Sequence, residues 1–325
     1  MPRRMLRIVL GTLALASPGL ALAEDQPVEV QIVDAMNALW GSHPGFRANH
    51  AKGVVVEGSF KASAEAAGLS RAVLFNGSAI PVTVRFSDGS GVPTVPDGAK
   101  LANPHGMSIK YHLPDGSEAD MVINALHFFP VSKPEDFRDL LRAIKASPPD
   151  APKPTKLEQF VAEHPSVPAA SATAKTPESF AEEEYFGVNA FYLVDKAGKK
   201  QAVRFRMVPD KVVHLDPDEA GKRAPNYLME ELPQRLKNGP VSFHLKAQVA
   251  NPGDPTNDAT KEWPADRKLV DLGVLTVEKA VSDSAAAEKP LLFLPGQLPD
   301  GIEVSDDPLI DARNNAYAVS FSRRQ

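Results

Sequence analysis

Cysteine is absent from the 325 residues of this chain, and its absence excludes several classes of site. Without disulfides, the fold has to be stabilised by a large buried core. Iron–sulfur clusters, thiolate-ligated haem, haem attachment through Cys-x-x-Cys-His and thiol nucleophiles are excluded as well. Any cofactor is therefore bound without a covalent link to cysteine.

Long apolar runs are also scarce, and the one near the amino terminus is short. Residues 1–23 carry a basic region with Arg3, Arg4 and Arg7, then an apolar stretch, and end in a small-x-small site at 21–23. This pattern predicts a cleavable secretory signal peptide. A membrane anchor is a poor alternative, because the stretch is too short to span and Pro18 interrupts it. We expect export to the periplasm.

No block of Lys and Arg follows this segment, so the chain has no obvious surface for polyanions. Loss of the three arginines changes the formal net charge from -5 to -8. The acidic balance and the missing basic block argue against nucleic acid or an anionic membrane as the main partner. We expect no stable membrane insertion. Residues 24–325 show no internal repeat, and we interpret them as a single domain. A monomer or a small homo-oligomer is expected.

Thirty prolines and closely spaced β-type runs predict a strand-rich fold. Parallel α/β folds place a helix after each strand, whereas these runs follow one another closely. We therefore predict an α+β fold, an antiparallel β-barrel with inserted and C-terminal helices. The predicted strands are 54–56, 81–86, 107–112, 121–129, 188–194, 203–207, 241–249 and 269–277.

Helix-start signals occur at three places. Ser132 with Glu135 three residues later resembles a capping box, and the segment 176–178 (Thr-Pro-Glu) predicts a second start. An acidic cap and an early proline at 306–308 predict the start of the last helix. The segment 146–175 is rich in Pro, Ala and Ser, and we expect a long connection with one short helix.

The last helix carries the pair from which a function can be inferred. Arg313 and Tyr317 are four residues apart, so a helix places the guanidinium beside the phenol. A neighbouring cation stabilises the ionised phenol, which is a hard anionic ligand of the kind that holds ferric iron in a haem. Alone, such a pair is usually an ordinary surface contact.

Four upstream segments give this pair a context. They read GFRANHAKG at 45–53, PVTVRFS at 81–87, DMVINALHFF at 120–129 and YFGVNAFYLV at 185–194. With the tail, they resemble the haem catalase family, in the family's order and across nearly all of the chain. In its length and its short C-terminus, the chain most resembles the compact catalase-related peroxidases of bacteria. The resemblance implies a barrel of the catalase type and haem b (iron protoporphyrin IX) as cofactor.

The resemblance also implies roles for individual residues. His50 matches a distal histidine that moves a proton between the two oxygens of a peroxide, and Asn124 matches an amide that orients the peroxide. Ser87 matches a serine that hydrogen-bonds the histidine and fixes its ring. The implied cofactor contacts are Tyr317 as iron ligand, Arg313 as its charge partner, Arg47, Arg85 and Arg324 at the haem propionates, and Phe137 stacked on the porphyrin.

Each of these residues has a simpler interpretation. An isolated histidine is usually solvated or satisfied in the core, and the Asn124 amide could be satisfied by backbone groups. Arg85 could make a surface salt bridge, and Phe137 could be an ordinary core residue. His105 lies in a loop with Pro and Gly, and we expect it to face solvent.

The function implied is a haem-dependent peroxidase that reduces hydrogen peroxide or organic peroxides with small organic electron donors. The chain ends eight residues after Tyr317, without the extensions of large catalases, so we expect an open pocket with weak catalase activity. The alternatives are rearrangement of organic hydroperoxides, a non-catalytic periplasmic haem-binding protein, and a barrel without cofactor.

Overall fold

A computed structural model describes residues 26–325, so the predicted signal peptide lies outside the described residues. Within 26–325 the β-structure consists of ten strands: β1 (Gly53–Ala62), β2 (Ala79–Ser87), β3 (Gly106–His112), β4 (Glu118–Asn124), β5 (Tyr185–Phe186), β6 (Phe191–Val194), β7 (Lys200–Pro209), β8 (Val241–Val249), β9 (Leu269–Ala280) and β10 (Ile302–Val304).

Eight of these strands form a closed barrel. Their order is β7-β5-β4-β3-β2-β1-β9-β8, and pairing of β7 with β8 closes the ring. Outside the ring, β6 pairs with β7, and β10 pairs with β6. Every pairing is antiparallel. The predicted antiparallel barrel is confirmed.

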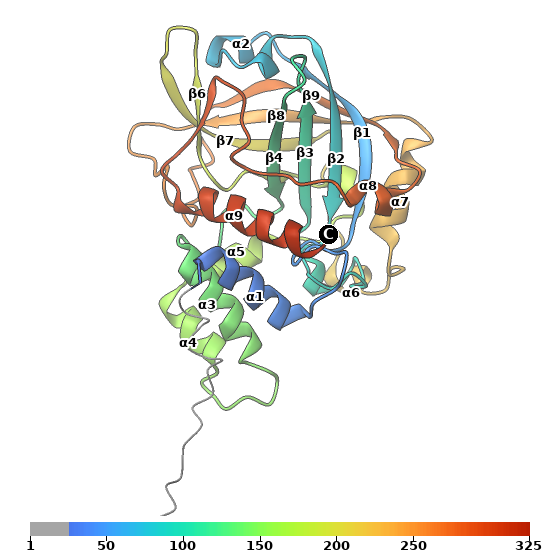
Figure 1. Ribbon diagram of the computed structural model, residues 1–325, viewed down its shortest axis with the longest axis vertical. Coiled ribbons are helices and arrows are strands. Elements are labelled where there is room, and N and C mark those ends of the chain that lie inside the picture. Colours follow the sequence, from blue (N-terminus) through green and yellow to red (C-terminus); the bar gives the residue numbers. More distant parts are fainter. Residues whose placement is uncertain (1–25) are drawn as a thin grey trace, which may run out of the picture.

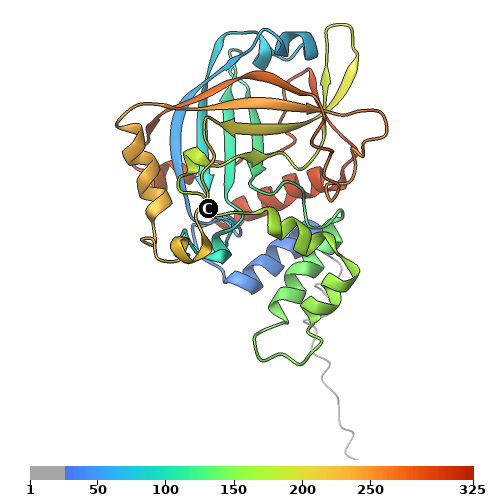
Figure 2. The same ribbon diagram turned by 180° about the vertical axis from the view of Figure 1, so that it is seen from behind.

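Helices gather at one end of the barrel. In Figure 1, α9 crosses the lower ends of β2–β4, and α1, α3 and α4 lie below it. α1 contacts both α3 and α9. Figure 2, the view from behind, shows the gold helix α7 along the side of the barrel. The helices within 26–325 are α1 (Val28–Trp40), α2 (Ala66–Leu69), α3 (Pro134–Lys145), α4 (Lys156–Glu163), α5 (Ser166–Thr173), α6 (Pro217–Ala220), α7 (Tyr227–Leu236), α8 (Ser284–Glu288) and α9 (Pro308–Arg323), with 3₁₀ turns η1 (Val73–Phe75), η2 (Lys100–Ala102) and η3 (Phe180–Glu182).

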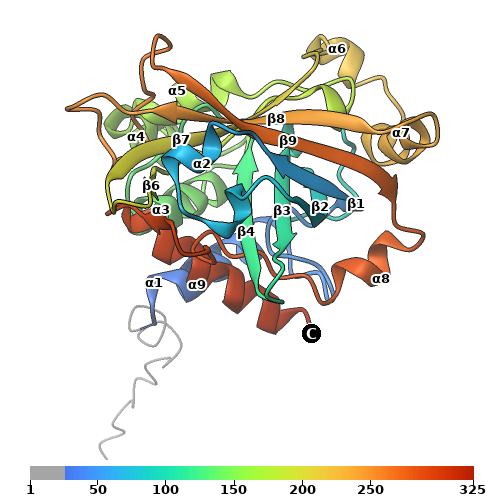
Figure 3. The same cartoon turned by 90° about the horizontal axis from the view of Figure 1, so that it is seen from above.

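The barrel interior is packed with aromatic side chains. The Phe86 ring stacks on Phe180 at a centroid distance of 5.5 Å, and it contacts Tyr185 and Phe243 at 5.9 and 6.0 Å. All four side chains are fully buried. Such packing stabilises the barrel and fills its centre. Figure 3, a view from above, shows the strands wrapping around this centre. A large ligand therefore has to bind between the barrel and the helices.

Several predicted element boundaries are wrong for identifiable reasons. The strand expected over 121–129 ends at Asn124, because the Asn124 Oδ1 accepts the Leu126 N–H and turns the chain. The segment 176–178 starts no α-helix, since its backbone pairs with that of 213–215 instead. The segment 146–175 contains two short helices, α4 and α5, rather than one.

Two helices begin where the sequence predicted, but only one of them has the predicted capping interaction. α3 begins at Pro134, but its N-cap is Lys133, and no side chain caps it, so the predicted capping box is wrong. The last helix, α9, begins as predicted, with Pro308 in its first turn and the Asp307 carboxylate accepting the Leu309 N–H at 3.0 Å. Among residues 26–325, none of the helices combines the length and the hydropathy that crossing a membrane requires.

Candidate haem site

One cavity of about 340 Å³ separates the barrel from the helices. Its walls come from β2, β3 and β4 on the barrel side and from α1, α3 and α9 on the helical side. A cavity of this size is typical of small-molecule and cofactor sites. The structure brings all nine residues predicted from the sequence to its walls: Arg47, His50, Arg85, Ser87, Asn124, Phe137, Arg313, Tyr317 and Arg324.

The helical wall carries Tyr317 with Arg313 one turn earlier. Arg313 donates through Nε to the Tyr317 phenol oxygen at 3.1 Å. Its other two nitrogens donate to the Asn189 Oδ1 at 2.5 Å and to the Val122 carbonyl at 3.0 Å. Asn189 in turn donates to the Asp307 carboxylate that caps α9, at 2.8 Å. The guanidinium is thus fixed by the barrel and turned toward the phenol.

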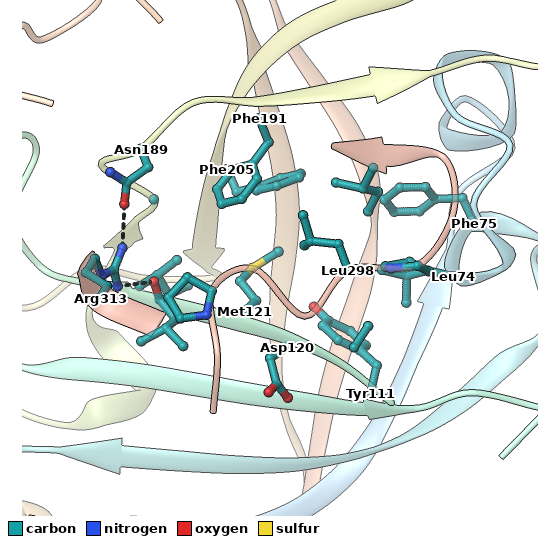
Figure 4. Close-up of a pocket in the computed structure, with 17 residues that line it drawn as sticks. Leu74, Phe75, Tyr111, Asp120, Met121, Asn189, Phe191, Phe205, Leu298 and Arg313 are labelled. Atoms are coloured by element: carbon teal, nitrogen blue, oxygen red, sulfur yellow. Dashed lines mark hydrogen bonds between the residues drawn. The ribbon is translucent and has the colours of Figure 1, made fainter. Parts of the chain in front are cut away.

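Arg313 also borders a second, much smaller cavity of about 30 Å³. Figure 4 shows Asn189 bonded to Arg313 at one end and Phe75 and Tyr111 at the other. Most of its other labelled residues are apolar, among them Met121. This space holds about one water molecule, so it is no alternative site for a cofactor.

His50 lies on the barrel side, in a strained backbone conformation. Its φ is 53°, in the left-handed region. The conformation is held by the Arg85 guanidinium, which donates to the His50 carbonyl at 2.9 Å, and by the Asn49 side chain, which accepts the His50 N–H at 2.9 Å. The Ser87 hydroxyl lies 3.1 Å from the His50 Nδ1. Strain retained in this way is common at functional positions.

The electrostatic surroundings keep the His50 imidazole neutral. Burial, together with electrostatic repulsion from Arg85, His105, Arg313 and Arg47, lowers the pKa of His50 to about 3. His50 keeps some accessible surface and lines the cavity. A neutral imidazole held by Ser87 on one nitrogen is free to accept a proton on the other.

Asn124 is the last residue of β4, directly opposite Gly106 of β3. Its Oδ1 accepts the Leu126 N–H at 2.8 Å, so a backbone group does satisfy part of the amide, as the simpler interpretation supposed. Because only the oxygen can accept that proton, the bond also fixes which end of the amide is the Nδ2 donor.

Three arginines meet at the far end of the cavity. Arg47 donates to Glu288 at 2.8 Å, and Arg85 lies 3.0 Å from the same carboxylate oxygen. Arg47 and Arg324 both donate to the Leu291 carbonyl, at 2.9 and 2.5 Å. Burial, with repulsion from Arg85 and Arg324, lowers the pKa of Arg47 well below its usual value.

This cluster suits a group with two carboxylates. Among the described side chains, the Nε atoms of Arg85 and Arg324 are buried without a hydrogen-bond partner. Unsatisfied guanidinium donors beside a cavity are suited to carboxylate ligands. Two propionates, as haem b carries, would satisfy them, so the residues present fit that group. Arg324 is held in place although it lies next to the end of the sequence.

Phe137 contributes an apolar wall from α3. Its ring is 5.3 Å from Phe129, and both rings line the cavity together with Leu140 and Leu141. Phe137 is partly buried and packs against two core clusters. Both the core interpretation and a contact with a flat ligand are compatible with this position.

Comparison with known proteins decides the family. Residues 27–324 match the family model described as Catalase. The chain belongs to the catalase family. It is 35% identical to a catalase-related peroxidase of Mycolicibacterium paratuberculosis over 90% of this chain and 94% of that protein. A catalase-related peroxidase of Synechococcus elongatus is 34% identical over 99% of this chain and 96% of its own length.

Longer members of the catalase family share the fold. A fungal catalase structure superposes with a TM-score of 0.78 at 21% identity, covering 100% of this chain and 66% of that one. A catalase of Pseudomonas syringae is 30% identical, and the match spans 56% of its length. The predicted family and the catalase-type barrel are thus confirmed, and catalase-family proteins generally bind haem and act on peroxide.

Three residues at this catalase-family site were missed. Asn189 orients Arg313, and Glu288 joins two of the arginines. His105, expected to face solvent, is completely buried, 3.4 Å from Asp88. The reason is that its loop packs inward, with the His105 carbonyl accepting the Ala125 N–H at 2.9 Å. The proline and glycine around His105 signalled a loop but not its burial.

Proposed function

We propose that this chain is a haem b peroxidase that reduces hydrogen peroxide or organic peroxides with small organic donors and has weak catalase activity. The observation that carries the proposal is the convergence of Tyr317, His50 and the arginine cluster on one cavity. The two catalase-related peroxidases that match over at least 90% of this chain support the peroxidase assignment.

Each residue of the site has a separate role in the proposed reaction. Haem b, when bound, supplies a ferric iron that exchanges electrons with peroxide and donor. The Tyr317 phenol oxygen would hold the iron, with Arg313 stabilising its negative charge. The neutral His50 imidazole accepts a proton from the incoming peroxide and returns it to the departing oxygen, and Asn124 orients the peroxide through Nδ2. Ser87 keeps the His50 ring in one orientation.

An apolar opening supports the use of organic donors. Ile144 at the end of α3 lines the cavity and is 37% exposed, so the cavity reaches the surface beside it. Leu140 and Phe137 continue this wall inward on the same helix. An apolar entrance of this kind suits small aromatic reductants, which bind through their rings.

The proposal is tested with the full chain loaded with haem b. We expect a Soret band that changes when peroxide is added, oxidation of a dye faster than release of dioxygen, and loss of the tyrosinate-type spectrum in Tyr317→Phe. Dominant dioxygen release would make the protein a catalase instead. Conversion of a lipid hydroperoxide without donor would indicate rearrangement, and a spectrum insensitive to peroxide would indicate a haem-binding protein without turnover.

We also propose that the protein works in the periplasm. The support is the signal-like composition of residues 1–23. Amino-terminal sequencing of the protein from a periplasmic extract should begin near residue 24. An intact amino terminus in the cytosolic fraction would contradict this.

A further inference from the structure

The arginine cluster contains one carboxylate of its own. A single oxygen of Glu288 lies 2.8 Å from the Arg47 guanidinium and 3.0 Å from the Arg85 guanidinium. The side chains of Arg85, Glu288 and Arg47 are 3%, 15% and 16% exposed, so the ion pairs are largely removed from water. Glu288 therefore joins two arginines that line the cavity, although it does not line the cavity itself.

The charges of the cluster do not cancel. Arg47, Arg85 and Arg324 carry three positive charges, and Glu288 carries one negative charge, which leaves a surplus of two. The same cluster holds the two buried Nε donors without partners, on Arg85 and Arg324. A surplus of two charges with two free donors corresponds to a ligand that brings two carboxylates.

The position of Glu288 is built into the fold. It is the last residue of α8, and the Asp283 carboxylate caps that helix by accepting the Ala286 N–H at 2.9 Å. The Ser284 hydroxyl accepts the Val55 N–H of β1 at 2.8 Å. The helix is thus attached to the barrel, and Glu288 approaches the arginines from behind the cavity wall.

We propose that Glu288 is a positioning residue with two opposite effects. When the cofactor is absent, its negative charge offsets part of the positive charge of the arginine cluster. When the cofactor binds, the same charge competes electrostatically with the cofactor's carboxylates. This inference rests on the proposed binding of haem b. Without Glu288, Arg47 and Arg85 would repel each other inside the protein. With haem bound, the propionates neutralise the arginines, and Glu288 adds repulsion between like charges.

Two opposite effects of Glu288→Gln follow. Glutamine keeps the size and one oxygen acceptor but removes the charge. The cofactor-free variant should unfold roughly 2–6 °C lower than the parent, because three arginines then remain uncompensated. The variant should nevertheless bind haem b more tightly, by roughly threefold to tenfold, because the repulsion of the propionates is gone.

The experiment titrates the cofactor-free full chain with ferric haem b and with its dimethyl ester, in which both carboxylates are neutral. Binding is followed by Soret absorbance and by quenching of Trp40, which lines the cavity. The gain in affinity should appear with haem b and disappear with the ester. Glu57→Gln, which removes the exposed pair of Glu57 with Lys279, is the matched control and should show neither effect.

The outcomes separate this inference from the function on which it rests. If the parent binds neither haem b nor its ester, the proposed function and the proposed role of Glu288 are both wrong. If the parent prefers haem b to its ester but Glu288→Gln binds haem b equally or more weakly, the role of Glu288 is wrong and the haem site stands. An equal gain with haem b and ester would likewise overturn it, because the effect would not involve the carboxylates.

Discussion

Arg313 and Tyr317 form a bonded pair on α9, with Nε 3.1 Å from the phenol oxygen and the guanidinium carbon 5.7 Å from the ring centroid. Because Arg313 acts through Tyr317, the two should not contribute independently. Tyr317→Phe should abolish the tyrosinate-type spectrum of the haem-loaded protein. Arg313→Gln should weaken haem binding by roughly tenfold to a hundredfold, since one charge-assisted bond is worth about 1.5–3 kcal/mol.

The double variant tests this dependence. In haem titrations, Arg313→Gln should cost little once Tyr317 is already Phe. Additive losses would show that Arg313 contacts the cofactor by another route. Arg206→Gln is a suitable control, because Arg206 pairs with Glu184 outside the cavity.

His50 should matter for turnover far more than for cofactor binding. His50→Gln removes the proton acceptor, and we expect kcat/KM for peroxide to fall by about 10²–10⁴-fold with little change in haem affinity. Ser87→Ala leaves the imidazole but frees its ring, so a loss of roughly tenfold is expected. Steady-state dye oxidation measures both. His244→Gln, at a pair with Asp271 outside the cavity, should retain full activity, and equal loss in this control would contradict the assignment.

Burial of His50 should also make stability depend on pH. Its pKa is about 3 in the fold, against an ordinary value of 6.5 when the chain is unfolded. The unfolded chain thus binds a proton that the native protein excludes, and stability falls as pH drops below about 6.5. Between pH 7 and pH 5, the cofactor-free parent should lose about 2 kcal/mol more unfolding free energy than His50→Gln. Urea unfolding of both proteins at pH 7 and at pH 5 measures this difference. Equal losses of unfolding free energy in the parent and in His50→Gln would show that the native protein protonates His50 as readily as the unfolded chain does.

Much of the site could be predicted because its residues lie in short continuous segments. The stretch 45–53 contains Arg47 and His50, and the stretch 81–87 contains Arg85 and Ser87. Alternating apolar residues indicated the strand of Arg85, whereas Arg47 and His50 lie in the loop before β1. The Asp-Pro start of α9 indicated the helix of Tyr317.

What could not be predicted depends on contacts between distant residues. Arg47 and Glu288 are 241 positions apart, and Arg313 and Asn189 are 124 apart. The segment of α8 reads SAAAE, which carries no motif and no amphipathic pattern. The two-residue strand β5 joins β4 to β7 and is too short to show alternation. Such features follow from barrel closure rather than from local sequence.

Gly106 offers a last test of how closely the His50 ring is packed. A β-carbon at this position would lie 3.0 Å from the His50 Cε1 and 3.1 Å from both the His50 Nδ1 and the Ser87 Oγ. Gly106→Ala should therefore displace the imidazole by a few tenths of an ångström and lower peroxidase kcat/KM by roughly tenfold, because proton transfer depends steeply on geometry.

Gly68→Ala serves as its control, because, apart from the neighbouring residues of its own helix, no atom of residues 26–325 lies within 4 Å of a β-carbon at position 68, and α2 tolerates alanine. That variant should be fully active and at least as stable as the parent. Gly106→Ala should keep the Soret spectrum of the parent, since the Tyr317 side of the cavity is untouched. Unchanged turnover in Gly106→Ala would mean that the His50 ring can shift without loss, and that its hydrogen bond to Ser87 does not set the rate.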